Sequence, residues 1–464
     1  MKYKVSLTIM SLLTVISISA FLSVKSLIKA VENDDANHSQ ITLINDFGLN
    51  TLLYKRLNSY VEDDQRWQNI AKTLAKIDGE VAFKLAKYYK NKQGENNFNI
   101  ELWLSQAIRL GHQQARIDLA KIYVDKKKLF DAKKLLLPIT SNGAALKILL
   151  EIIISIGEKQ EIARYIKQLQ AISTDEQSEE QSEELQDFSK KLTRYNVLNT
   201  PSIPSPVNCL AMIAPFATNL SDLAHFEQLI SSSTLATLAP YLCFSPVQYV
   251  SKITLACRQN DNEAIRCDES IWQNKKLAPN NRFIAVLVEK GGANVNSGIL
   301  YIDSNDNAEV FYHELAHLLG FIDEYALPKN HSRCLAIQKS MFSHNIAILP
   351  RFYQGSQESV RAEILNELPW AKYISSKTAL VIHTAKGWKL GTMSEEVDTV
   401  GAFIAESCNE IDFVAIKPLN QRTTMRYYQA GFPALYLKLL AENPEKFLMP
   451  HYLYNVSSAL NAKK

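Results

Sequence analysis

The pattern His-Glu-x-x-His-x-x-Gly-x-x-Asp, which begins at His313, constrains the fold of this 464-residue chain more than any other feature. On a helix, His313 and His317 lie one turn apart on the same face, where two neutral imidazoles can bind one zinc ion. Glu314 beside them is placed to accept a proton from a water molecule at the metal. Gly320 can adopt the left-handed conformation that ends a helix, so the chain can turn back toward the metal. Asp323 is then the candidate third ligand of a two-histidine, one-carboxylate site.

Two other interpretations of the motif remain open. An amphipathic helix with two incidental histidines would also show this spacing, because its apolar positions would face a core. A glutamate could replace Asp323 as the third ligand, since three of them follow on a predicted helix: Glu358, Glu363 and Glu367. Gly320 argues against the glutamates, because zinc enzymes that use a later glutamate continue the helix at this point instead of turning.

The motif continues directly into Glu324 and Tyr325. In this form it resembles the metzincin zinc peptidases, with aspartate in place of their third histidine, and more narrowly the IgA-peptidase family. Further segments resemble that family and follow in its order: 369–374 (Pro-Trp-Ala-Lys-Tyr-Ile), 400–403 (Val-Gly-Ala-Phe), 417–418 (Lys-Pro) and 424–426 (Thr-Met-Arg). The chain departs from the family at Ile404, where a glutamate is usual, and at Ile416 and Lys417, where Tyr-Arg is usual. The resemblance covers about residues 208 to 440.

The resemblance implies several features of the site. An edge strand beside the cleft, for which 293–302 is the candidate, would bind an extended peptide by strand addition. A methionine in a tight turn beneath the metal would form its apolar floor, with Met425 and Met393 as the two candidates. Tyr427 or Tyr428 would be the donor of a hydrogen bond to the reaction oxyanion; the favoured alternative for each is a packed side chain.

The N-terminus, residues 1–30, is typical of a targeting segment. Lys2 and Lys4 precede an uncharged, mostly apolar run, 5–24, that Lys25 closes. The run is long enough to span a bilayer, which favours an uncleaved signal anchor over a cleaved signal peptide. Either form predicts export, with the body anchored at the inner membrane and facing the periplasm, or secreted after cleavage.

The cysteines agree with export. An even number confined to one part of an exported chain predicts disulfides rather than free thiols. Several connectivities remain open; proximity favours Cys257–Cys267, and Cys209–Cys243 with Cys334–Cys408 would complete the set. None of the cysteines has the paired spacing of a structural zinc site.

Residues 45–172 have apolar positions at helical spacing and few strand signals. A pattern recurs within them at about the 34-residue period of tetratricopeptide repeats: Leu85-Ala86-Lys87 and Tyr89 recur as Leu119-Ala120-Lys121 and Tyr123, and Trp67 and Ala71 as Trp103 and Ala107. The order resembles helix-pair repeats of the Sel-one-like and tetratricopeptide class. An ordinary helical bundle is the alternative. Repeats of this class present surfaces to partners, which implies an envelope protein as a candidate partner.

The pattern changes after residue 172. Residues 173–206 are acidic and then proline-rich, which predicts a domain boundary: a solvated linker or a helix end, and then an extended entry into the next domain. Residues 207–464 mix strand and helix signals, with strands expected at 210–214, 247–256, 282–288 and 298–302 and a helix at 220–232. The predicted fold class is therefore an all-α helix-pair repeat region followed by an α+β, metzincin-like zinc peptidase domain.

Charge and motif together define the function classes to be tested. The chain has 51 basic and 48 acidic residues and a net charge of +3, which gives no basis for nucleic-acid binding. The expected function is a zinc-dependent endopeptidase that hydrolyses a protein or peptide substrate in the bacterial envelope or exterior. The alternative is a catalytically silent envelope interaction protein that acts through its helical repeats.

Overall fold

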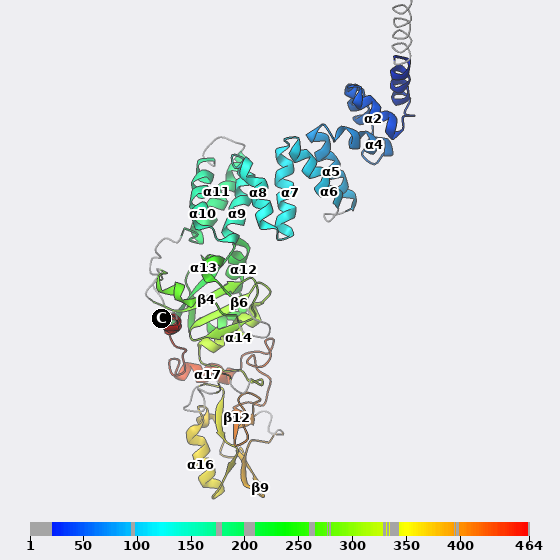
Figure 1. Ribbon diagram of the computed structural model, residues 1–464. Helices are drawn as coiled ribbons and strands as arrows, with labels where there is room; N and C mark the ends of the chain where they lie inside the picture. Colours follow the sequence, from blue (N-terminus) through cyan, green and yellow to red (C-terminus); the bar gives the residue numbers. More distant parts are fainter. Residues whose placement is uncertain are drawn as a thin grey trace, which may run out of the picture. The chain divides into compact units, whose positions relative to one another are not determined.

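The computed structural model describes residues 21–93, 98–172, 179–198, 209–258, 265–275, 277, 280–327, 331, 334, 343–393, 395 and 399–462. The chain divides into two compact units, here called the helical unit (Met1–Ile153 with Arg164–Gln186) and the site unit (Ile154–Ala163 with Asp187–Lys464). Figure 1 shows the helices of the first in blue to green and the sheets of the second in green to orange.

The described part of the helical unit contains helices only. After a helical segment at 21–32, they are α2 (His38–Asp46), α3 (Asn50–Leu57), α4 (Gln65–Leu74), α5 (Gly79–Gln93), α6 (Phe98–Arg109), α7 (Gln113–Asp125), α8 (Leu129–Leu136), α9 (Gly143–Ile156) and α10 (Lys159–Ile172). Consecutive helices from α2 to α8 pack as neighbours, most extensively α5 against α6 and α7 against α8. The expected all-α region is therefore present.

Small residues lie where these helices approach one another. Ala71, Ala107, Ala115 and Ala120 are all fully buried, as the repeat pattern requires. A Cβ atom added to Gly79 would lie 3.2 Å from Leu110 Cβ, so the start of α5 packs closely on the end of α6. These contacts are those of helix pairs; the Sel-one-like class remains a prediction.

Part of the predicted boundary segment at 173–206 is a helix. Residues Glu179–Arg194 form a helix, α11, and its apolar residues Leu185, Phe188 and Leu192 are buried. Their spacing is that of one helix face, which the surrounding acidic residues obscured. Pro201, Pro204 and Pro206 lie outside the described residues.

A six-stranded sheet forms the core of the site unit. Its order is β2-β1-β4-β6-β5, with β3 also pairing with β1, and only β5 is antiparallel to its neighbour. The strands are β1 (Ala211–Ala217), β2 (Leu242–Phe244), β3 (Gln248–Tyr249), β4 (Asn281–Val288), β5 (Asn294–Asn296) and β6 (Ile299–Asp303). The central strands are almost wholly buried, which explains their continuous apolar runs.

Helices and two small sheets complete the described part of this unit. The helices are α12 (Leu220–Ile230), α13 (Lys252–Leu255), α14 (Ala308–Leu318), α16 (Gln357–Glu367), α17 (Ala434–Glu442) and α18 (Leu453–Ala462), with short 3-10 helices η2 (Ser233–Leu238) and η3 (Glu269–Gln273). One small sheet joins β8 (Phe352–Tyr353), β10 (Gly387–Leu390) and β9 (Val381–Thr384); the other joins β11 (Phe403–Ile404), β12 (Phe413–Lys417) and β7 (Ala347–Pro350).

The expected strand at 247–256 is wrong beyond β3. Ser251 accepts a hydrogen bond from the Thr254 amide and so begins the short helix α13. The other expected strands, and the helix at 220–232, are present with bounds that shift by a few residues. An α+β region thus follows the helical one.

All six cysteines form disulfides: Cys209–Cys243, Cys257–Cys267 and Cys334–Cys408. This confirms the favoured pairing, and it indicates an oxidising, extracytoplasmic environment. Among the described helices, none is both long and apolar enough to span a bilayer. Most of the predicted anchor, residues 1–20, lies outside the described part of the chain.

Candidate metal centre

Helix α14 carries the motif through the centre of the site unit. Asn307 caps its first turn, because the side-chain oxygen accepts a hydrogen bond from the Val310 amide at 3.1 Å. The helix packs against α12, β5 and β6, and every residue from Phe311 to Leu318 is buried. The motif residues therefore face a protein interior rather than solvent.

Gly320 ends this helix in a left-handed turn. Its φ is +89°, its amide donates to the His317 carbonyl and the next amide, of Phe321, donates to the Ala316 carbonyl, both at 3.1 Å. This pair of bonds defines a Schellman motif, which reverses the chain direction within two residues. A Cβ atom at this position would lie 2.5 Å from Phe447 Cβ, so glycine is required for the approach as well as for the angle.

Backbone carbonyl groups fix the orientation of both imidazoles. His317 Nδ1 lies 2.8 Å from the Phe321 carbonyl oxygen, in the turn that Gly320 makes, and His313 Nδ1 lies 2.8 Å from the Thr424 carbonyl oxygen. Because a carbonyl oxygen only accepts, each Nδ1 carries the proton. Each Nε2 of a neutral ring therefore presents a lone pair.

The two Nε2 atoms converge on one carboxylate. Asp323 Oδ1 lies 3.1 Å from Nε2 of His313 and 3.2 Å from Nε2 of His317, and all three side chains are buried. The imidazole planes are nearly perpendicular, at 84°. Three acceptor atoms held together in a buried place repel one another unless a proton or a cation lies among them.

A metal ion fits this arrangement. Ligand atoms about 2.0–2.1 Å from a tetrahedral zinc ion lie about 3.3 Å from one another, close to the observed separations. Burial lowers the pKa of His313, but Asp323 and Glu314 raise it more, and the net shift is upward. The same negative field that favours an imidazolium favours a bound cation, so the centre could hold a metal ion.

Two carboxylates compete for the role of third ligand. A Glu314 oxygen and the ligand nitrogens of His313 and His317 all lie within 4.8 Å of one another, and this trio alone would qualify as a metal group. Asp323 Oδ1 lies 3.1 Å from Nε2 of His313 and 3.2 Å from Nε2 of His317. These separations are close to those of ligand atoms around one zinc ion, so Asp323 is the candidate third ligand and Glu314 the candidate for proton transfer.

The alternative glutamates lie elsewhere. Glu358, Glu363 and Glu367 are exposed on α16, a helix that packs on β7 and η4 (Ala371–Tyr373). Figure 1 shows α16 in yellow at the small sheets and α14 in yellow-green beneath the six-stranded sheet. Glu363 and Glu367 act on Tyr353, whose pKa is raised by burial and by their negative charge.

Two tyrosines border the centre. The ring of Tyr428 lies 5.0 Å from that of His313, and the residue is 39% exposed; partial burial raises its pKa, and Glu314 and Asp323 raise it further. Tyr325 stacks parallel to His313 at 6.5 Å and hydrogen-bonds to Asp323, and its pKa is raised by burial and by that carboxylate. Both hydroxyl groups therefore remain protonated donors. Tyr427 is exposed to the same extent, but its ring lies beneath the guanidinium groups of Arg422 and Arg426.

The structure distinguishes the two methionines. Met425 is fully buried and follows Thr424, whose carbonyl orients His313, whereas Met393 is 47% exposed. Of these two methionines, burial therefore makes Met425 the candidate for the apolar floor. Sequence reasoning missed the carbonyl groups of Phe321 and Thr424, because a backbone acceptor leaves no signal in residue type.

Comparison of the sequence with models of known protein families, and with curated proteins, finds no match.

Proposed function

We propose that the chain is a zinc-dependent endopeptidase of the metzincin type, related to the IgA-peptidase family, with His313, His317 and Asp323 as its zinc ligands. The observation that carries the proposal is the convergence of both Nε2 atoms and one carboxylate oxygen in a buried place. The sequence that produces this geometry is also the extended peptidase motif, from the first histidine through Gly320.

Bound zinc would polarise the scissile carbonyl and lower the pKa of the attacking water. Glu314, buried beside the centre, accepts the proton of that water and delivers it to the leaving amine. Tyr428 or Tyr325, both held as protonated donors, would donate a hydrogen bond to the oxyanion. Tyr428 is the better candidate, because Tyr325 already bonds to Asp323.

The substrate class follows from the sheet. Strand β5 is an edge strand of the six-stranded sheet, and it contacts α14. An extended peptide that pairs with β5 would therefore lie beside the metal centre. The expected edge strand at 293–302 includes this strand. We infer a protein or peptide substrate outside the cytoplasm, in agreement with the three disulfides.

Metal content and proteolysis test this function separately. The whole chain should contain about one zinc ion, and His317→Ala should lose it. Wild type should cleave an unstructured protein such as casein, and Glu314→Gln should keep its zinc and lose the cleavage. A folded wild type without zinc refutes the metal centre. A zinc-loaded wild type that cleaves neither casein nor a peptide library would instead support an interaction protein that acts through the helical unit.

A further inference from the structure

A buried ion pair adjoins the candidate metal centre, and its carboxylate belongs to the residue that follows Asp323. Glu324 is 0% exposed, and its Oε2 lies 2.6 Å from Nζ of Lys417, which is also buried. Removing two charges from water is costly, and a pair of apolar residues would often be equally stable. A role beyond stability therefore has to be sought in what the pair connects.

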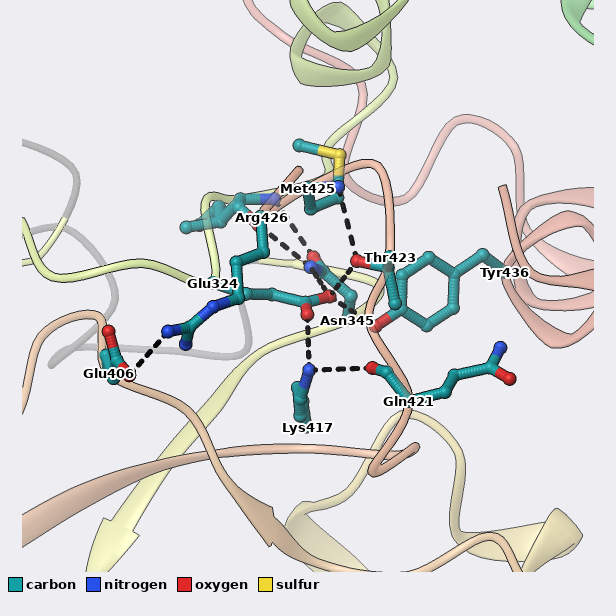
Figure 2. Close-up of polar contacts among 10 residues, drawn as sticks. Glu324, Asn345, Glu406, Lys417, Gln421, Thr423, Met425, Arg426 and Tyr436 are labelled. Carbon is teal, nitrogen blue, oxygen red and sulfur yellow. Dashed lines mark hydrogen bonds and ion pairs between the residues drawn. The ribbon is translucent and has the colours of Figure 1, made fainter. Parts of the chain in front are cut away.

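Every oxygen of this carboxylate has a partner, as Figure 2 shows. Besides the lysine, Glu324 accepts hydrogen bonds on Oε1 from Thr423 Oγ1 at 2.8 Å and Tyr436 Oη at 2.6 Å. Lys417 Nζ donates a second bond to the Gln421 carbonyl oxygen at 3.1 Å. The donors come from separate segments of the chain, so Glu324 gathers them around one point.

The network reaches the turn that orients the first histidine. Thr423 Oγ1 accepts a hydrogen bond from the Met425 amide at 3.2 Å, and the Glu324 amide donates to the Met425 carbonyl oxygen at 2.9 Å. Between these two residues lies Thr424, whose carbonyl oxygen accepts from His313 Nδ1. Glu324 thus holds the turn on both sides of the carbonyl that sets the tautomer of His313.

The same network fixes the segment before Glu324. Asn345 bonds to both backbone groups of Ile322, at 2.9 Å to its amide and 2.8 Å to its carbonyl oxygen, and also contacts Glu324 Oε1 at 3.4 Å. Asp323 lies between Ile322 and Glu324, so the backbone on each side of this ligand is held. Glu324 therefore contacts both the segment that carries Asp323 and the turn that orients His313.

We propose that Glu324 is a positioning residue for the metal centre: its buried carboxylate joins the Asp323 segment to the 423–425 turn and so sets the carboxylate ligand and the tautomer of His313 together. This inference rests on the proposed zinc site and adds a residue to it. Loss of groups that hold metal ligands in place commonly weakens metal binding by about 10–100-fold. The same loss is expected for Glu324.

The test measures zinc affinity of the whole chain by competition with a chromophoric chelator. Glu324→Gln keeps the size of the side chain and removes its charge, and should bind zinc about 10–100-fold more weakly. The visible spectrum of the cobalt-substituted protein should also change, because that spectrum reports ligand geometry. Glu269→Gln is the matched control: this half-buried glutamate also accepts from a tyrosine, Tyr301 Oη at 3.1 Å, but lies on η3. Its zinc affinity and cobalt spectrum should match those of wild type.

A second variant guards against a simple failure to fold. Thr423→Val keeps the shape of the side chain and leaves the ion pair intact, but removes the hydroxyl group that joins Glu324 to the turn. It should bind zinc several-fold more weakly and alter the cobalt spectrum in the same sense. Wild-type affinity and spectrum in folded Thr423→Val, or in folded Glu324→Gln, would overturn the positioning role alone. A wild type that binds no zinc would overturn the proposed function and this inference together.

Discussion

Replacing Gly320 with alanine should destabilise the C-terminal end of α14. The residue has φ +89°, and its new Cβ would overlap the Phe447 carbonyl oxygen and lie 2.5 Å from Phe447 Cβ. The left-handed conformation costs a non-glycine residue about 1–2 kcal/mol. Forcing a methyl group against backbone atoms adds about 1–3 kcal/mol, because backbone cannot move aside as a flexible side chain can. The local stability should therefore fall by about 2–5 kcal/mol.

Hydrogen–deuterium exchange measured by mass spectrometry reports this loss locally. Since about 1.4 kcal/mol corresponds to a tenfold change, amides of α14 should exchange roughly 30- to 5,000-fold faster in the variant. Peptides from α5, in the helical unit, should exchange as in wild type and serve as an internal reference. Zinc binding should weaken as well, because the turn places the carbonyl that orients His317.

Gly292 supplies the control for the conformational part of this cost. It also has a positive φ, +65°, but nothing lies within 4 Å of a Cβ atom built there. Gly292→Ala should therefore cost only about 1–2 kcal/mol, roughly 5- to 30-fold in the exchange of its own region. If Gly320→Ala accelerates exchange no more than Gly292→Ala does, the argument from close packing against Phe447 is refuted.

Three further predictions follow from burial and charge. Asp323→Ala should release zinc and Glu367→Ala should retain it, as metal analysis of both proteins would show; the reverse result would restore the alternative ligand. Met425→Ala should lower the free energy of unfolding by about 2–5 kcal/mol and Met393→Ala by less than about 0.5 kcal/mol in denaturant titrations, since only the first is buried. Burial, with a smaller effect of a nearby lysine, lowers the pKa of His344 from 6.5 to about 4. The folded protein holds His344 neutral, whereas the unfolded chain protonates it below about pH 6.5. The contribution of His344 to the free energy of unfolding is therefore fully present above about pH 6.5, and about 3 kcal/mol of it is lost as the pH falls toward 4. In His344→Gln the free energy of unfolding should change less between pH 6.5 and pH 4. An unchanged pH dependence would contradict the role of His344.

Much of the fold could be predicted from local pattern. The expected strand at 282–288 corresponds to β4 and the one at 298–302 to β6, because buried parallel strands have long apolar runs that few helices share. The apolar run at 247–256 predicted a strand that is present only in part, because Ser251 starts a helical turn inside it. A single capping residue outweighed strand propensity there, which composition alone does not reveal.

The acidic stretch shows a second limit. Leu185, Phe188 and Leu192 give α11 an apolar face, but glutamates and serines dominate the sequence around them. Composition suggested solvated chain, whereas three well-spaced apolar residues were enough to bury one side of a helix.

For the candidate metal centre, the convergence of its side chains could be predicted from the sequence, and the groups that support them could not. Spacing along one helix places His313 and His317, and a glycine-dependent turn brings Asp323 to them; all of this is local. Lys417 follows Glu324 by 93 residues, and no periodicity in the sequence pairs them. A lysine beside β-branched and apolar residues in β12 was the only available signal, and it is equally typical of an exposed strand end.

The distance along the chain between His313 and Thr424, 111 residues, has a consequence for when the centre forms. The ribosome completes α14 long before it makes the carbonyl that orients its first imidazole. Until that later segment has been synthesised and folded back, the histidines belong to a helix without a defined tautomer. The proposed metal capture would therefore be a late event in maturation, because any fragment that ends before Thr424 lacks the carbonyl group that orients His313.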